Sequence, residues 1–77
     1  MEKDLIEYIA KSLVDEPDSV EVNVVEGEKS TILELRVSPS DMGKIIGKRG
    51  RIAKAMRTVL QASSSKNGKH TILEILD

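Results

Sequence analysis

The residues of this chain best suited to bind a ligand are basic side chains gathered around a pair of glycines. Gly47 and Gly50 enclose Lys48 and Arg49. Of the 12 lysines and arginines and the 13 acidic residues in the chain, six basic residues and no acidic one fall between positions 42 and 57. Because the net charge of the whole chain is only −1, this local positive excess is typical of a surface that binds a polyanion. The six residues are Lys44, Lys48, Arg49, Arg51, Lys54 and Arg57.

The chemistry that this arrangement predicts is the binding of phosphate. The two glycines allow the backbone to turn sharply and leave room for another backbone to approach. A helical pattern begins again after Gly50, so the free N–H groups and the positive dipole end of a second helix face the turn. A helix N-terminus beside cationic side chains is an anion site. We therefore interpret residues 47–50 as a clamp on a nucleic-acid backbone. The alternative is that the cations only keep two helices soluble.

Other chemistries find little support in the sequence. The chain has no cysteine, and its single histidine, His70, cannot form a metal cluster alone. A nucleotide-binding P-loop does not fit, because Gly43 and Gly47 are one residue too close and Arg49 stands where a hydroxyl is required. His70 and Glu74 share one face of a predicted strand, which is a common coincidence. We expect no enzymatic activity, no metal and no cofactor.

The aromatic content limits how a nucleic acid could be bound. Tyr8 is the only aromatic residue, and we expect it on the half-buried flank of a helix. Single-strand binders that stack bases on aromatic platforms are therefore excluded. Binding would have to rest on backbone clamping, cationic side chains and aliphatic contacts.

Length and hydropathy indicate one small domain over residues 1–77. No apolar run approaches the roughly 20 residues that a membrane helix requires. The first residues lead directly into an amphipathic pattern that is unlike a signal peptide. We expect a cytoplasmic protein with no membrane contact.

The first half of the chain predicts a helix followed by a hairpin. Apolar residues recur at helical spacing over Lys3–Val14. Alternating patterns over Val20–Val25 and Thr31–Val37 predict two strands joined by a short turn, and hence antiparallel. In the second strand, Leu33, Leu35 and Val37 occupy the face expected to be buried.

The second half predicts two helices and a last strand. Ser38 and Asp41 have the spacing of a capping box, with a short helix expected from Pro39 to about Ile46. A longer helix is expected over Arg51–Ser64 and a strand over His70–Leu76. The buried stripe of the longer helix is predicted to comprise Ile52, Ala55, Met56, Val59, Leu60 and either Ala62 or Ser63.

These elements follow one another in the order α-β-β-α-α-β. The last strand returns after a two-helix crossover, so it should run parallel to Thr31–Val37. The predicted fold class is α+β: a three-stranded mixed sheet with three helices on one face.

The central stretch of the chain resembles the signature of a known family. Its central stretch, Ile45-Ile46-Gly47-Lys48-Arg49-Gly50-Arg51-Ile52, resembles the I-I-G-x-x-G-x-x-I signature of KH domains with one residue fewer before the last isoleucine. Read from Ile46, it matches the shorter I-G-x-x-G-x-I form. Together with the α-β-β-α-α-β order, this resembles a type II KH domain over the whole chain. The small size is similar to the KhpA group of bacterial RNA-binding proteins.

The resemblance implies that single-stranded RNA lies in a groove with the GxxG loop, residues 47–50, against its sugar-phosphate backbone. It also implies an RNA chaperone or post-transcriptional regulator, forming a homodimer or a heterodimer with a larger KH-containing protein like KhpB. Strand Thr31–Val37 and the loop Ser63–Lys69 would form the opposite wall, and the shortness of that loop implies low sequence specificity. The residues expected to contact RNA are Lys44, Ile45, Ile46, Gly47, Lys48, Arg49, Gly50, Arg51, Ile52 and Lys54.

A protein-interaction module with little intrinsic RNA binding is the main alternative. Ile32, Ile72 and Leu76 lie out of phase with the predicted core faces. If they gather on the open face of the sheet or at one of its edges, they could be buried against another subunit. Scattered apolar surface residues are also ordinary in a monomer.

Overall fold

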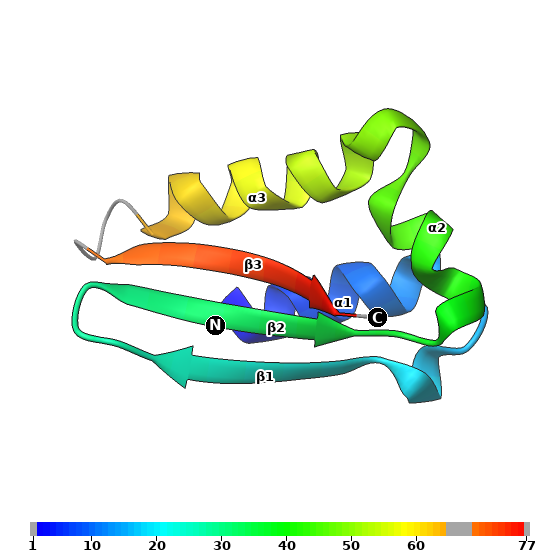
Figure 1. The fold of residues 1–77 in the computed structure, drawn as a ribbon, viewed down its shortest axis with the longest axis horizontal. Helices are drawn as coiled ribbons and strands as arrows, with labels where there is room; N and C mark the ends of the chain where they lie inside the picture. The colour runs from blue at the N-terminus through cyan, green and yellow to red at the C-terminus, as the bar shows by residue number, and fades with distance from the viewer. Residues whose placement is uncertain (1, 65–68, 77) are drawn as a thin grey trace.

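A computed structural model describes residues 2–64 and 69–76, and the elements follow the predicted order (Figure 1). Single turns of 3₁₀ helix at Pro17–Ser19, Pro39–Asp41 and Lys48–Gly50 occupy three of the connections. Most of the expected loop Ser63–Lys69 falls outside the described residues. The main elements are α1 (Glu2–Leu13), β1 (Glu21–Glu26), β2 (Ser30–Arg36), α2 (Met42–Ile46), α3 (Arg51–Ser64) and β3 (His70–Leu76).

The sheet confirms the predicted topology. Its strand order is β1-β2-β3. Leu33 in the central strand β2 pairs with Val24 of antiparallel β1 and with Leu73 of parallel β3. Both parallel strands point toward the end of the molecule that carries α2 and the turn into α3 (Figure 1). The topology therefore brings the ends of β2 and β3 to the same side as the glycine loop.

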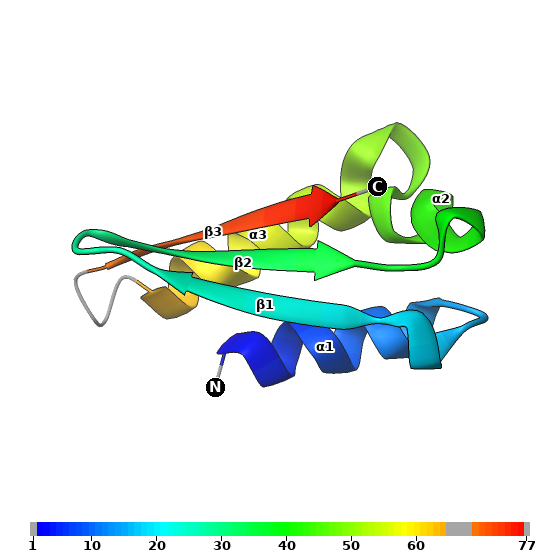
Figure 2. The ribbon, with the colours of Figure 1, turned by 60° about the horizontal axis from the view of Figure 1, so that its bottom comes forward.

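Helices cover one face of the sheet (Figure 2), and the core lies between these helices and the sheet. The predicted inward face of β2 is confirmed, because Leu33, Leu35 and the following Val37 are at most 5% exposed. All three helices contribute buried residues to the same cluster, as expected of three helices on one face. The core cluster comprises Ile6, Ala10, Val22, Leu33, Leu35, Val37, Ile45, Met56, Leu60 and Leu73.

Several side chains that the periodicity assigned to the interior are exposed. Ala55 and Val59 of α3 are exposed, since only the neighbouring line of Ala53, Met56 and Leu60 faces the sheet. Tyr8 is 72% exposed, so its predicted half-buried position is wrong. The apolar stripe of α3 is wider than its contact with the sheet, so part of the stripe stays exposed.

The predicted capping box is also wrong. The Ser38 side chain makes no capping hydrogen bond to the helix, and its hydroxyl donates instead to Glu16. Asp41 is 1% exposed and its carboxylate accepts the backbone N–H groups of Asp15, at 3.1 Å, and of Glu16, at 3.0 Å. The carboxylate therefore ties the start of α2 to the chain that follows α1.

Candidate nucleic-acid interface

The glycine loop joins α2 to α3 through backbone conformations that favour glycine. Gly47 ends α2 with a φ of 78°, and Gly50 has a φ of 72°. The Gly47 N–H donates to the Gly43 carbonyl at 2.9 Å, and the Gly50 N–H donates to the Gly47 carbonyl at 3.1 Å. Helix α3 begins at the next residue, Arg51, so its first N–H groups lie directly beside the loop.

The two glycines serve different purposes. A Cβ on Gly47 would lie 2.6 Å from Cγ1 of Ile52, which is closer than packed atoms come. Gly47 is therefore packed from inside by the first turn of α3. A Cβ on Gly50 would meet no atom within 4 Å. The expected room for an approaching backbone thus exists at Gly50, but not on the packed side of Gly47.

Arg49 is held in a strained conformation. Its φ of 59° makes it the one non-glycine residue with positive φ in the described part of the chain. For an L-residue the left-handed region costs roughly 1 kcal/mol. The surrounding loop holds the Arg49 backbone in this conformation, and the residue is exposed. Strain of this kind tends to occur at functional sites.

Exposed cations surround the loop. Lys48 and Arg49 lie within it, and Arg51 and Lys54 follow in the first turn of α3; all four are exposed. Within residues 2–64 and 69–76, none of these four forms an ion pair with a carboxylate. Their charges are therefore available to an anionic ligand, and the positive end of the α3 dipole adds to them.

Lys44 differs from those four residues. Its ammonium group pairs with the carboxylates of Asp15 and, at 3.4 Å, of Asp41. The hydrogen bond from Lys44 to Asp15 is the main cause that raises the lysine pKa, against a smaller opposing effect of burial. The positive charge of Lys44 is thus largely offset, which distinguishes it from the other predicted RNA contacts.

Asp41 is held ionised by the same cluster. The N–H group of Asp15 is the largest influence and lowers the pKa of Asp41, while burial opposes it. The N–H group of Glu16 and the Lys44 ammonium lower this pKa further. Sequence reasoning missed the cluster because its members lie about 25 residues apart, as in the Glu16–Asp41 contact. The acidic turn at Asp15 and Glu16 was the available signal.

The three isoleucines expected to contact RNA lie in different environments. Ile45 is fully buried in the core and presents no surface to a ligand, so it cannot lie under bases. Ile46 is 37% exposed beside the loop. Ile52 is half-buried and packs against Gly47. Ile45 and Ile46 are neighbours on the short helix α2, so they point in different directions: Ile45 faces the core and Ile46 faces outward.

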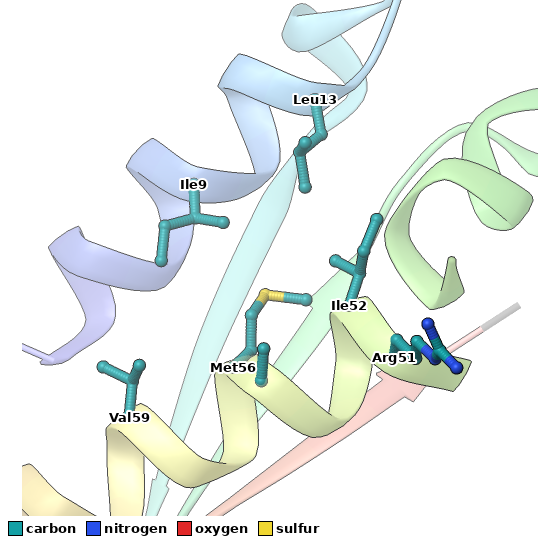
Figure 3. Close-up of a pocket in the computed structure, with 7 residues that line it drawn as sticks. Ile9, Leu13, Arg51, Ile52, Met56 and Val59 are labelled. Atoms are coloured by element: carbon teal, nitrogen blue, oxygen red, sulfur yellow. The ribbon is translucent and has the colours of Figure 1, made fainter. Parts of the chain in front are cut away.

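An apolar groove that was not predicted lies between α1 and α3, close to the loop (Figure 3). It has a volume of about 330 Å³. Arg51 stands at the loop end of the groove, and the other lining residues are apolar. The side chains of α1 and α3 point toward one another across the opening without closing it. The apolar lining residues are Ile9, Leu13, Ile52, Ala55, Met56 and Val59.

The open face of the sheet carries a second apolar surface. Val25, Ile32 and Ile72 are aligned across the three strands by the pairing register. Val25 is 46% exposed and Ile72 is 45% exposed. We refer to these three residues as the sheet row. Leu76, which was expected to join it, lies further along β3, opposite Arg36.

The described residues offer no metal site. Across positions 2–64 and 69–76, no three histidine or acidic side chains gather closely enough to hold an ion. In the same part of the chain, no helix has the length and apolar character needed to cross a membrane.

Comparison with solved structures finds this fold within a larger protein. The chain superposes on Era from Aquifex aeolicus with a TM-score of 0.61 over 96% of its length, at 23% sequence identity. It spans only 29% of the Era chain. This likeness shows the fold of a domain and carries no activity with it.

The sequence identifies the family more narrowly. The model of the KhpA/KhpB KH domain matches residues 3–75, and the chain belongs to this family. The RNA-binding protein KhpA of Borreliella burgdorferi is 66% identical, over 99% of this chain and 93% of its own. The proteins of the same name from Clostridium perfringens and Treponema pallidum are 62% and 52% identical, over 96% and 100% of this chain and 99% and 96% of their own. These relatives are named as RNA-binding proteins, not as enzymes, which agrees with the expectation from the sequence.

Proposed function

We propose that this chain is a single KH domain that binds single-stranded RNA through its glycine loop. The observation that carries the proposal is the set of four exposed cations around the loop, Lys48, Arg49, Arg51 and Lys54, that pair with no carboxylate of the described residues. Three relatives quoted above are named RNA-binding proteins. The phosphates of about four nucleotides would lie against the loop, the length that a KH domain holds.

The proposed mechanism is mainly electrostatic. Phosphates replace counterions at the exposed cations, which releases those ions and makes binding dependent on salt. The Gly50 backbone is open to close approach, and Ile46 offers an aliphatic surface beside it. Because Tyr8 is the only aromatic residue, bases find little stacking surface. We therefore expect modest affinity and low overall sequence preference.

The test is the double variant Lys48→Asp with Arg49→Asp, measured for binding to a short labelled single-stranded RNA. The matched control is Lys3→Asp with Lys29→Asp, because both lysines are exposed, unpaired within the described residues and far along the chain from the loop. We expect the loop variant to lose binding while its circular dichroism spectrum is unchanged, and the control to bind nearly as wild type. Equal losses in both variants would mean that the loop is not the site.

In the cell, we expect an RNA chaperone or post-transcriptional regulator that acts in the cytoplasm. Cross-linking in the native cell, followed by sequencing of the attached RNA, would test this. Recovery of many transcripts from wild type and few from the loop variant is the expected result. Low and equal recovery from both would favour an interaction module.

Association with another KH-containing chain is the second part of the proposal. The apolar groove between α1 and α3 and the sheet row are two surfaces on which a partner could bury apolar area. The matching family model covers the KH domains of both KhpA and KhpB. We expect a homodimer, a heterodimer with a larger KhpB-like protein, or both. Sedimentation of the pure protein as a monomer at high micromolar concentration would contradict the homodimer.

A further inference from the structure

Arg57 is a basic residue of α3 that does not belong to the four cations proposed to bind phosphate around the loop. Its Nε group donates a hydrogen bond of 3.4 Å to the backbone carbonyl of Leu73 in β3. The contact is partly buried and joins the helix to the sheet. No carboxylate of residues 2–64 and 69–76 pairs with Arg57. The guanidinium is thus fixed at one nitrogen, while its two terminal amino groups have no acidic partner there.

The carbonyl that Arg57 contacts lies on the free edge of the sheet. β3 pairs with β2 alone, and the His70 N–H donates to the Lys29 carbonyl at 3.1 Å. Because backbone groups alternate in direction along a strand, the even-numbered residues of β3 face β2. The N–H and C=O groups of Thr71, Leu73 and Ile75 therefore face outward. This edge offers a row of backbone donors and acceptors, and Arg57 occupies one acceptor of that row.

Arg57 also lies within reach of a single-stranded RNA held by the loop. It stands seven residues after Gly50, which is about 10 Å along a helix axis. The parallel strands end on the loop side of the molecule (Figure 1), so the edge of β3 leads from Arg57 toward the loop. About four nucleotides bound at a KH loop cover this distance.

We infer that Arg57 reads one base of the bound RNA and prefers guanine. The inference rests on the proposed RNA-binding function. A guanidinium held at Nε presents its terminal N–H groups as a planar fork, which matches the adjacent O6 and N7 acceptors of guanine. Adenine presents an amino group in place of O6, and this donor would face the N–H donors of the guanidinium, which has no acceptor. One guanine-preferring position is compatible with low specificity along the rest of the strand.

The test compares short uridine-rich RNAs that differ in a single base, guanine or adenine, moved stepwise along the strand. Wild type should bind the guanine RNA about tenfold more tightly than the adenine RNA at one position. Arg57→Lys keeps the charge but lacks the fork, so it should retain most affinity and lose the preference. Lys54→Gln, a nearby exposed cation, should weaken both RNAs equally and keep their ratio.

Three results would overturn the inference. They are the absence of any preference in wild type at every position, a preference that Arg57→Lys keeps, and an equal weakening of all RNAs by Arg57→Gln, as a phosphate contact would give. A variant that aggregates while the preference is kept would show that Arg57 only shields the edge of β3. The measurement on wild type needs no variant, so the inference can still be overturned if a variant folds poorly. Failure of the proposed function is separate, since it appears as unchanged binding by the Lys48→Asp, Arg49→Asp protein.

Discussion

Single-residue geometry separates three glycines that look alike in the sequence. Gly47 has positive φ and is packed against Ile52, Gly50 has positive φ in open space, and Gly43 has open space without positive φ. The sequence predicted that glycine is needed in the loop, because a turn between two helices requires it. It could not predict that Ile52 fills the side of Gly47, since that contact depends on how α3 enters the loop.

Alanine substitutions at these glycines should rank accordingly. Gly47→Ala combines backbone strain with a clash and should lower the free energy of unfolding by about 2 kcal/mol or more. Gly50→Ala should cost about 1 kcal/mol from strain alone. Gly43→Ala, within α2, should be neutral or stabilising by up to about 1 kcal/mol. Urea unfolding followed by circular dichroism measures all three, and a Gly47→Ala protein as stable as Gly43→Ala would contradict the geometry.

Replacing Arg49 should affect RNA affinity more than it affects stability. Arg49→Gly removes the left-handed strain but gives the unfolded chain more freedom. These effects oppose one another, so the free energy of unfolding should stay within about 1 kcal/mol of wild type. RNA affinity should nevertheless fall, because one exposed cation is lost. If the glycine variant binds RNA as tightly as wild type, Arg49 is not a contact.

Elements were predicted well where periodicity decides them and poorly where distant residues meet. The strands, their faces and the parallel return of β3 follow from alternation and chain connection. The apolar residues of α3 were identified, but the groove that leaves Ala55 and Val59 exposed depends on the spacing between α1 and α3. The local spacing of Ser38 and Asp41 suggested a capping box, whereas the carboxylate binds backbone far along the chain. Local patterns cannot reveal such a contact.

Acid should reveal the Asp41 contact. Its ordinary pKa is near 3.8, and the folded protein lowers it. The unfolded chain therefore binds the proton more readily, so the stabilisation is fully present above about pH 4 and is lost as the pH falls through the lower folded pKa. Asp41→Asn should be less stable than wild type at neutral pH, because the amide has one acceptor oxygen for two N–H groups.

The control for this experiment is Asp18→Asn, at an exposed carboxylate without a partner in the described residues. Thermal unfolding from pH 7 to pH 2.5 should show a steeper loss of stability for wild type and for Asp18→Asn than for Asp41→Asn. Parallel curves for all three proteins would mean that Asp41 does not supply this stabilisation.

At the scale of the whole molecule, positive charge and exposed apolar area lie on separate surfaces. The loop and the first turn of α3 lie at one end and carry positive charges that have no acidic partner among residues 2–64 and 69–76. The groove between α1 and α3 and the sheet row are apolar and lie on opposite sides of the sheet. The sequence predicted apolar residues out of phase on the sheet and suggested association there. It did not predict the groove, so two surfaces are candidates for the proposed association.

Charge placed on each surface should identify the one that associates. Val59→Glu puts a carboxylate into the groove, and Ile72→Glu puts one into the middle of the sheet row. Both side chains are more than 40% exposed, at 44% and 45%, so the fold should tolerate either change. Sedimentation velocity should show that one variant is monomeric and the other assembles as wild type. If neither variant shifts the association of wild type, both surfaces are excluded as its main contact.

The most direct test of the central claim is the dependence of RNA affinity on salt. Each phosphate contact on a single strand contributes about −0.7 to the slope of log K against log salt. Four cations without an acidic partner among the described residues, Lys48, Arg49, Arg51 and Lys54, predict a wild-type slope of about −2.8 between about 50 and about 200 mM salt. Lys48→Gln with Arg49→Gln should reduce its magnitude by about 1.4. A flat slope for wild type, or an unchanged slope in this variant, would contradict phosphate clamping by the loop.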